Sequence, residues 1–289
     1  MSEFSRLYTQ ILEYRTQKEA DMALACIQIK THNIRVMITD DRQQRLLAFD
    51  EIQFTRNLSQ EEQILQIQHF LPESGLSKFP VKQVQLIYEP RHFVLVPEPI
   101  WDEKNAHEYL LQTGDPDYDF RIMEQPFGEG HHLVFALPLV WQNWASQLFE
   151  SSEMQWCTSL LPLINRGMES CKTGNSLLMA SVENAYVFIL AFRDGSLQFL
   201  NRFDFRTEND LLYFCLLAAE TAGIQPEKDR FLLCGSLLPS SLGFEKLNRY
   251  FGATEFLSEK GILKEETGTA FLQHSVYFDF MVHLPISVS

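Results

Sequence analysis

Three short stretches of the sequence carry polar or small residues at places where an apolar run ends. A lysine in such a place can bind phosphate, and a carboxylate can hold a divalent cation. A glycine after a strand lets a ligand approach the backbone closely. The six candidate ligand-binding residues are Gln28, Lys30, Ser181, Glu183, Cys234 and Gly235.

The glycine content limits the phosphate chemistry that these residues could support. The chain has 13 glycines, and the first of them is Gly75, so residues 22–54 cannot contain a glycine-based phosphate loop. Such loops need glycine because backbone N–H groups must approach the phosphate. Lys30 is therefore predicted to be a solvated lysine at a strand end. Glu183 would repel phosphate unless a metal ion intervened.

Other clusters of ligand-type residues do not have the spacing of a metal site. His131 and His132 are adjacent, and adjacent residues of a strand point to opposite faces. Residues 115, 117 and 119 are aspartates that alternate as in a calcium loop, but the sixth position is Phe120 and the twelfth is Pro126. No nucleophile motif of the GxSxG type occurs. We expect no metal and no hydrolase chemistry.

The charge balance argues against one large class of partners. The 289 residues include 24 Lys and Arg against 38 Asp and Glu, which gives a formal net charge of −14 at pH 7. A protein of this charge is repelled by nucleic-acid phosphates and by anionic lipids. General nucleic-acid binding and binding to a membrane are therefore not expected.

The cysteines and the apolar runs indicate the compartment. None of the 5 cysteines forms a CxxC pair, and Cys26, Cys215 and Cys234 lie inside apolar runs, as reduced core residues do. No apolar stretch approaches the roughly 20 residues that span a bilayer. The sequence therefore predicts a cytoplasmic protein.

Residues 22–54 have the pattern of an antiparallel meander. Three extended apolar runs, at 22–30, 34–39 and 45–54, are separated by short polar turns. A helix is expected after Ser59, because Ser59 and Glu62 have the spacing of a capping box. Residues 81–89 are typical of a buried strand that follows this helix.

Residues 176–235 repeat the same order of elements. Three strand-like runs are followed by a helix from Glu208 to Ala222 that ends at Gly223, and then by a strand. A further helix is predicted from Leu242 to Tyr250. The alternative interpretation is that the repeated order and the constant offset arose by chance, because meanders followed by helices are common.

Two alignments of the copies are possible. An offset of 151 residues pairs Asn33 with Asn184, whereas counting back from the turn at 194–195 pairs Gln28 with Ser181. The two alignments differ by two residues, which preserves the face of each strand.

The repeated order β-β-β-α-β-α predicts an α/β protein with two lobes that face each other across a cleft. Residues 1–21 are assigned to a polar N-terminal segment, 22–165 to the first lobe and 166–289 to the second lobe. The middle section, residues 93–165, is included in the first lobe.

This duplicated order resembles the actin-like ATPase superfamily, which includes actin, sugar kinases, heat-shock chaperone ATPases and bacterial pilus-assembly and cell-division proteins. More closely, residues 93–97 leading into a helix at 101–111, and residues 132–138 leading into 141–149, resemble an uncharacterised bacterial family of unknown function. The resemblance covers residues 22–283 and implies an actin-like, ribonuclease H-like fold.

The resemblance also implies where a nucleotide site would lie. Relatives typically carry Asp-x-Gly in two phosphate hairpins, and a glycine pair after the last strand. Here Gln28 and Lys30 stand at the Asp and Gly positions of the first hairpin, and Ser181 and Glu183 at those of the second. Only Gly235 remains of the glycine pair. The resemblance therefore implies a degenerate site.

From these observations we expect a non-catalytic binding or scaffolding module with no cofactor, whose partner is another protein. The first alternative is a divergent nucleotide-binding enzyme or kinase that reuses Lys30, Ser181 or Glu183 at the cleft between the lobes. The second alternative is a cleft that binds another small molecule.

Overall fold

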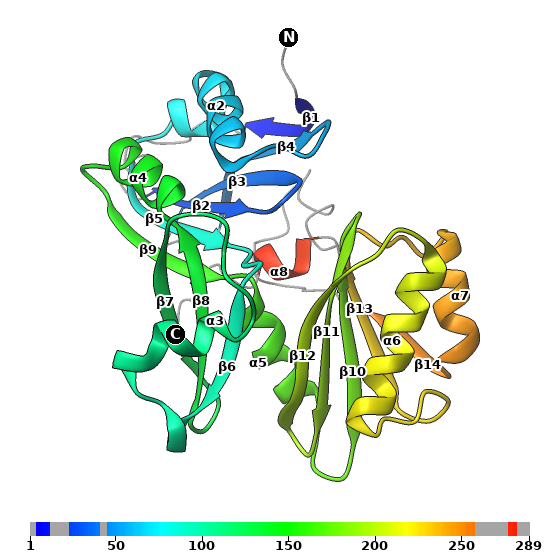
Figure 1. The fold of residues 1–289 in the computed structure, drawn as a ribbon. Helices are drawn as coiled ribbons and strands as arrows, with labels where there is room; N and C mark the ends of the chain where they lie inside the picture. Colours follow the sequence, from blue (N-terminus) through cyan, green and yellow to red (C-terminus); the bar gives the residue numbers. More distant parts are fainter. Residues whose placement is uncertain (1–3, 12–22, 41–44, 258–276, 282–289) are drawn as a thin grey trace. The chain divides into compact units, whose positions relative to one another are not determined.

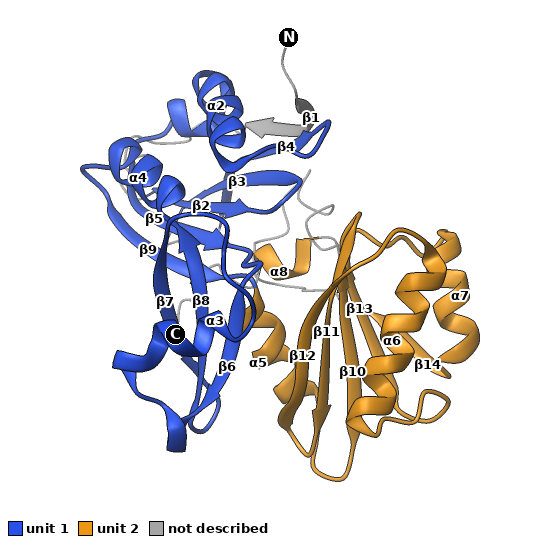
Figure 2. Cartoon of the chain, viewed as in Figure 1, with its two compact units in different colours: residues 1–159, 262–264, 284–289 blue, residues 160–261, 265–283 orange. Residues whose placement is uncertain are grey.

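The computed structural model describes residues 4–11, 23–40, 45–257 and 277–281. The chain divides into two compact units (Figure 2). Unit 1 comprises residues 1–159, 262–264 and 284–289, and unit 2 comprises residues 160–261 and 265–283. The predicted lobe boundary at residue 165 stays a prediction.

Unit 1 contains a six-stranded sheet with the order β1-β4-β3-β2-β5-β9 (Figure 1). Neighbouring strands from β1 to β2 are antiparallel, and β5 and β9 continue the sheet in parallel with β2. The strands are β1 (Phe4–Ile11), β2 (Ala23–Ile29), β3 (Asn33–Asp40), β4 (Arg45–Phe54), β5 (Val81–Tyr88) and β9 (Glu153–Thr158).

A second sheet in unit 1 has the order β6-β8-β7 and is antiparallel throughout. Its strands are β6 (Phe93–Pro97), β7 (Phe120–Phe127) and β8 (His131–Pro138). The described residues of unit 1 form the α-helices α2 (Gln60–Phe70), α3 (Ala106–Leu111) and α4 (Leu139–Leu148). Short 3-10 helices are η1 (Leu71–Glu73), η2 (Gly75–Ser77), η3 (Glu98–Ile100) and η4 (Glu103–Asn105).

Unit 2 contains a five-stranded sheet with the order β12-β11-β10-β13-β14. Its strands are β10 (Ser176–Val182), β11 (Tyr186–Arg193), β12 (Ser196–Asp204), β13 (Arg230–Gly235) and β14 (Ala253–Phe256). Its helices are α5 (Leu160–Ser170), α6 (Glu208–Ala222), α7 (Leu242–Tyr250) and α8 (Phe278–Met281).

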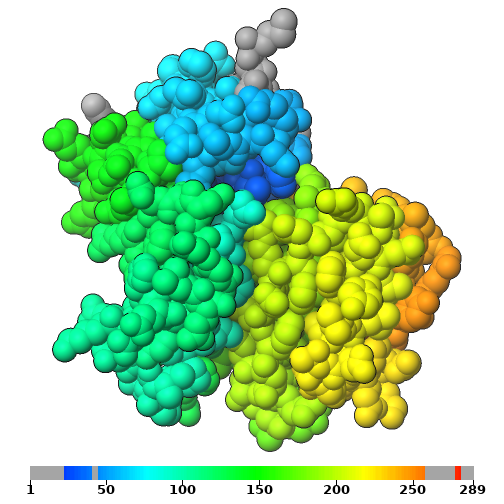
Figure 3. Space-filling model, viewed as in Figure 1, coloured from blue at the N-terminus to red at the C-terminus, as the bar shows by residue number. Residues whose placement is uncertain are grey.

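The helix α6 packs on one face of the sheet of unit 2 through a continuous apolar core. Alternate residues of β10 and β11 pack against the buried side of α6, because successive side chains of a strand point to opposite faces of the sheet. In the space-filling view, the yellow atoms of residues 208–222 are visible on the front surface of unit 2 (Figure 3). No helix among the described residues is both long and apolar enough to cross a bilayer.

The two units share one strand order, so the predicted fold class is confirmed. In each unit the first strand of the meander lies between the second strand and the strand that follows the helix. Each unit also has a β-bulge at the same place, where Ile38 faces Ala48 in unit 1 and Ala191 faces Phe199 in unit 2. A shared irregularity of this kind indicates that the second unit repeats the first.

Local sequence signals placed α2 and α6 correctly, whereas the helix expected at 101–111 is the 3-10 helix η4 followed by α3, which begins at Ala106. Ser59 and Glu62 form the predicted capping box at the start of α2, and Thr207 and Asp210 form another at the start of α6. Gly223 ends α6 with a left-handed φ of 65°.

Several elements were not predicted. The polar N-terminal segment contributes a strand, β1, to the edge of the sheet. β9 and β14 are short edge strands, and β9 begins with three exposed residues, so neither has a strong apolar pattern. α5 contains Pro162 and Gly167, which disfavour helix in isolation. Gly167 is needed because a Cβ there would lie 2.0 Å from the ring of Phe192.

Candidate functional site

The first candidate hairpin joins β2 to β3 in unit 1. The backbone N–H of Lys30 donates to the carbonyl of Asn33 over 3.0 Å and closes the turn. Gln28 lies two residues earlier, directly opposite Arg35 of β3. Gln28, Lys30 and Arg35 are all buried.

The hairpin that joins β10 to β11 in unit 2 repeats these contacts. The N–H of Glu183 donates to the carbonyl of Tyr186 over 2.8 Å. Ser236 N–H donates to Val182, just as Glu89 N–H donates to Ile29 in unit 1. Glu183 is therefore equivalent to Lys30.

The equivalence decides between the two alignments of the copies. It supports the pairing of Gln28 with Ser181, an offset of 153 residues, and makes the pairing of Asn33 with Asn184 wrong. The offset of 151 holds only after the next hairpin, where four residues (41–44) in the first copy correspond to the two residues Asp194 and Gly195 in the second.

Gln28 belongs to a buried polar network across three strands. Arg35 donates from Nε to Oε1 of Glu51 over 2.9 Å and from Nη1 to Oε1 of Gln28 over 3.1 Å. Asn33 also donates to Oε1 of Glu51 over 3.0 Å. The position that the resemblance assigns to a magnesium-binding carboxylate thus holds an amide oxygen that accepts from a cation.

Lys30 is not the solvated lysine that the sequence predicted. Its side chain is 1% exposed, and its Nζ lies 3.6 Å from Oε2 of Glu89, whose side chain is 2% exposed. Lys30 is buried because β2 and β5 are parallel, so the residues that follow these two strands meet at the same end of the sheet. The apolar residues 86–88 at the end of β5, followed by a glutamate, were the available signal for Glu89.

In unit 2, Glu183 lies next to two polar residues that the sequence did not single out. Ser236 Oγ donates to Oε2 of Glu183 over 2.9 Å. Asp279 of α8 is also buried, and one of its carboxylate oxygens lies within 4.8 Å of one from Glu183. Sequence could not place Asp279, because no pattern links α8 to β10.

The remaining candidates lie together in the sheet of unit 2. Ser181 of β10 and Cys234 of β13 are register partners, and both are buried. Gly235 has a φ of 87°, and a Cβ there would lie 2.3 Å from the carbonyl oxygen of Val182. The close contact between β13 and β10 therefore accounts for this glycine without a nucleotide.

Away from the hairpins, His132 of β8 lies between two carboxylates. Its Nδ1 is 2.6 Å from Glu124 and its Nε2 is 2.5 Å from Glu98, and its ring stacks on Trp101 at 4.6 Å. Burial opposes protonation of the ring, but the hydrogen bonds to Glu124 and Glu98 outweigh it and raise the pKa of His132 above 6.5. The two carboxylates thus favour the imidazolium, in which both ring nitrogens donate.

This geometry predicts a pH-dependent stability. Because the folded pKa is raised, the stabilisation is complete below the unfolded pKa, near 6.5, and is lost as pH rises through the folded value. Urea unfolding of wild type and His132→Gln, between about pH 5.5 and 8.5, should give a stability difference that shrinks as pH rises. The double variant Glu98→Gln/Glu124→Gln should remove most of that pH dependence, and an undiminished dependence would contradict the assignment.

Comparisons with known proteins support the fold and leave the activity open. A protein from Bacteroides thetaiotaomicron, described as having an actin-like ATPase fold and unknown function, superposes with a TM-score of 0.69 at 15% identity, over 85% of this chain and 94% of that chain. The PilM-PilN type IV pilus biogenesis complex gives a TM-score of 0.57 at 12% identity, over 90% of this chain and 97% of that chain. No protein with a curated function matches. A family model described as "Protein of unknown function (DUF3822)" matches residues 13–253, and the chain belongs to this family.

Proposed function

We propose that this protein is a non-catalytic actin-like module of the cytoplasm that binds or scaffolds another protein. One observation carries the proposal: at both hairpins, the polar side chains that would meet MgATP are engaged with neighbouring side chains. Lys30 pairs with Glu89 in unit 1, and Glu183 accepts a hydrogen bond from Ser236 in unit 2.

Charge also disfavours MgATP at the hairpin of unit 1. A magnesium ion beside Gln28 would lie close to the guanidinium of Arg35, a cation in a buried, low-dielectric place. A phosphate near Lys30 would face the carboxylate of Glu89. The residues present therefore do not fit MgATP as the resemblance implies it.

Three observations support a protein partner in a reducing compartment. A chain of the PilM-PilN type IV pilus biogenesis complex shares the fold, and the net charge of −14 opposes nucleic acid as the partner. All five cysteines are buried and free, as is usual where thiols stay reduced.

One observation favours the alternative of a divergent nucleotide-binding enzyme. Glu183 and Asp279 place two buried carboxylates within 4.8 Å of each other in unit 2, and such a pair can hold a divalent cation. Nucleotide binding would then depend on Glu183.

We expect the purified protein neither to bind MgATP tightly nor to hydrolyse it. Losing one charge-stabilising group commonly lowers a rate about a hundredfold or more, and this chain lacks several. Calorimetric titration with MgATP to about millimolar concentration should give no saturable heat.

The variants Lys30→Ala and Glu183→Ala separate the two readings of the site. If wild type binds MgATP with micromolar affinity and either variant abolishes that binding, the degenerate-site proposal is wrong and the enzyme alternative takes its place.

A further inference from the structure

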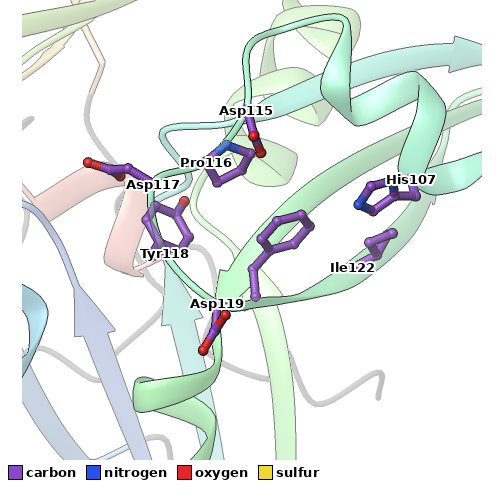
Figure 4. Close-up of a pocket in the computed structure, with 8 residues that line it drawn as sticks. His107, Asp115, Pro116, Asp117, Tyr118, Asp119 and Ile122 are labelled. Carbon is purple, nitrogen blue, oxygen red and sulfur yellow. The ribbon is translucent and has the colours of Figure 1, made fainter.

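A groove of about 820 Å³ lies in unit 1 between α3 and the start of β7 (Figure 4). The loop that precedes β7 supplies three carboxylates to it, from Asp115, Asp117 and Asp119. All three aspartates are exposed, and none of them forms an ion pair or hydrogen bond through its carboxylate with another described residue. In Figure 4 they are spread along the rim of the groove and do not converge on one point.

Aromatic rings line the same groove between the carboxylates. The ring of His107 stacks on Phe120 with centroids 5.9 Å apart and an interplanar angle of 5°. Tyr118 meets Phe120 edge-on at 6.3 Å and 80°. Phe120 and Tyr118 are half-buried, so each residue keeps some exposed surface in the groove. We call the site formed by these rings and the three aspartates the acidic groove.

The carboxylates and aromatic rings of the acidic groove match an arginine side chain. The guanidinium of arginine is planar, stacks on aromatic faces and donates two parallel hydrogen bonds to a carboxylate, whereas the ammonium of lysine is a point charge. Carboxylates spread along a rim suit an extended segment with several cations better than one small ion. The net charge of −14 adds a long-range attraction for such a segment.

We propose that the acidic groove binds an arginine-containing segment of a partner protein. The proposal rests on the proposed function as a protein-binding module and names the chemistry of one partner segment. The aspartates hold the cations of the segment, and Phe120 and Tyr118 stack against the guanidinium groups.

Fluorescence anisotropy with a labelled octapeptide of alternating glycine and arginine tests the proposal, at about 0.15 M salt, where distant charges are screened. Changing the three groove carboxylates to amides in Asp115→Asn/Asp117→Asn/Asp119→Asn should weaken binding about tenfold, since several exposed ion pairs are lost together. The matched control changes three exposed glutamates elsewhere in unit 1, Glu61→Gln/Glu129→Gln/Glu150→Gln, and should stay within about twofold of wild type.

A second arm tests the aromatic contact. Phe120→Leu keeps an apolar side chain but removes the ring. It should therefore weaken binding of the arginine peptide more than binding of a lysine peptide of the same length. Equal losses in the two triple variants would mean general attraction to an acidic protein and would overturn the proposal, as would no binding by wild type at millimolar peptide.

The outcomes separate this inference from the proposed function. Tight MgATP binding that depends on Glu183, together with selective loss of peptide in the groove variant, would refute the degenerate site and leave the groove assignment standing. Absence of both MgATP and peptide binding would refute the groove alone.

Discussion

Replacing Arg35 with methionine should destabilise the protein by about 3–5 kcal/mol, because it removes one partner of the buried ion pair with Glu51. Arg35 is 2% exposed and Glu51 is 4% exposed, and the guanidinium also donates to Gln28. Methionine has a similar length and keeps the packing of the aliphatic part of the side chain. The loss therefore reports the removal of the buried Arg35–Glu51 charge pair rather than a cavity.

Urea unfolding of wild type, Arg35→Met and the double variant Arg35→Met/Glu51→Leu measures this effect. The double variant removes both charges, so it should recover most of the lost stability, since an apolar pair can replace a buried ion pair at little cost. If the single and double variants are equally unstable, packing and not charge dominates at this position.

Replacing Gly235 with alanine should also lower the free energy of unfolding strongly, by about 3 kcal/mol or more. The new Cβ would lie 2.3 Å from the carbonyl oxygen and 2.9 Å from the nitrogen of Val182, and the φ of 87° is strained for any residue with a Cβ. Because both atoms are backbone, β10 and β13 would have to move apart.

Gly174 supplies the matched control for this substitution. Its φ is 82°, close to that of Gly235, but a Cβ there meets nothing within 4 Å. Gly174→Ala should therefore lower the free energy of unfolding only by the strain of a positive φ, about 1 kcal/mol. Thermal unfolding of the two variants would separate conformational strain from the steric contact, and equal shifts in Tm would show that the contact is relieved cheaply.

The sequence predicted those parts of the fold that depend on local signals. The capping box of Ser59 and Glu62 and the stop at Gly223 act within a few residues, and the apolar runs of both meanders are long enough to define strands. The repeated order of elements along the chain predicted the two-lobed fold class. Short edge strands such as β9 were missed because they have little apolar pattern of their own.

The environment of the candidate residues could not be predicted from the sequence. Gln28 and Lys30 were identified at the hairpin, yet their partners Arg35 and Glu89 come from other strands of the sheet. Which side chain pairs with which depends on the register of neighbouring strands, and the sequence alone did not fix that register. Lys30 was expected to be solvated because it stands at a strand end, and its partner Glu89 follows a strand much later in the chain.

The two-residue difference between residues 41–44 and the Asp194-Gly195 turn bears on how the gene of such a protein can change. An insertion of one residue at this hairpin tip would reverse the faces of the following strand and expose its core side chains, whereas an insertion of two leaves every face in place. After a tandem duplication, selection would therefore retain length changes here in even steps. The copies can lose almost all residue identity and still keep the same alternation of inward and outward side chains.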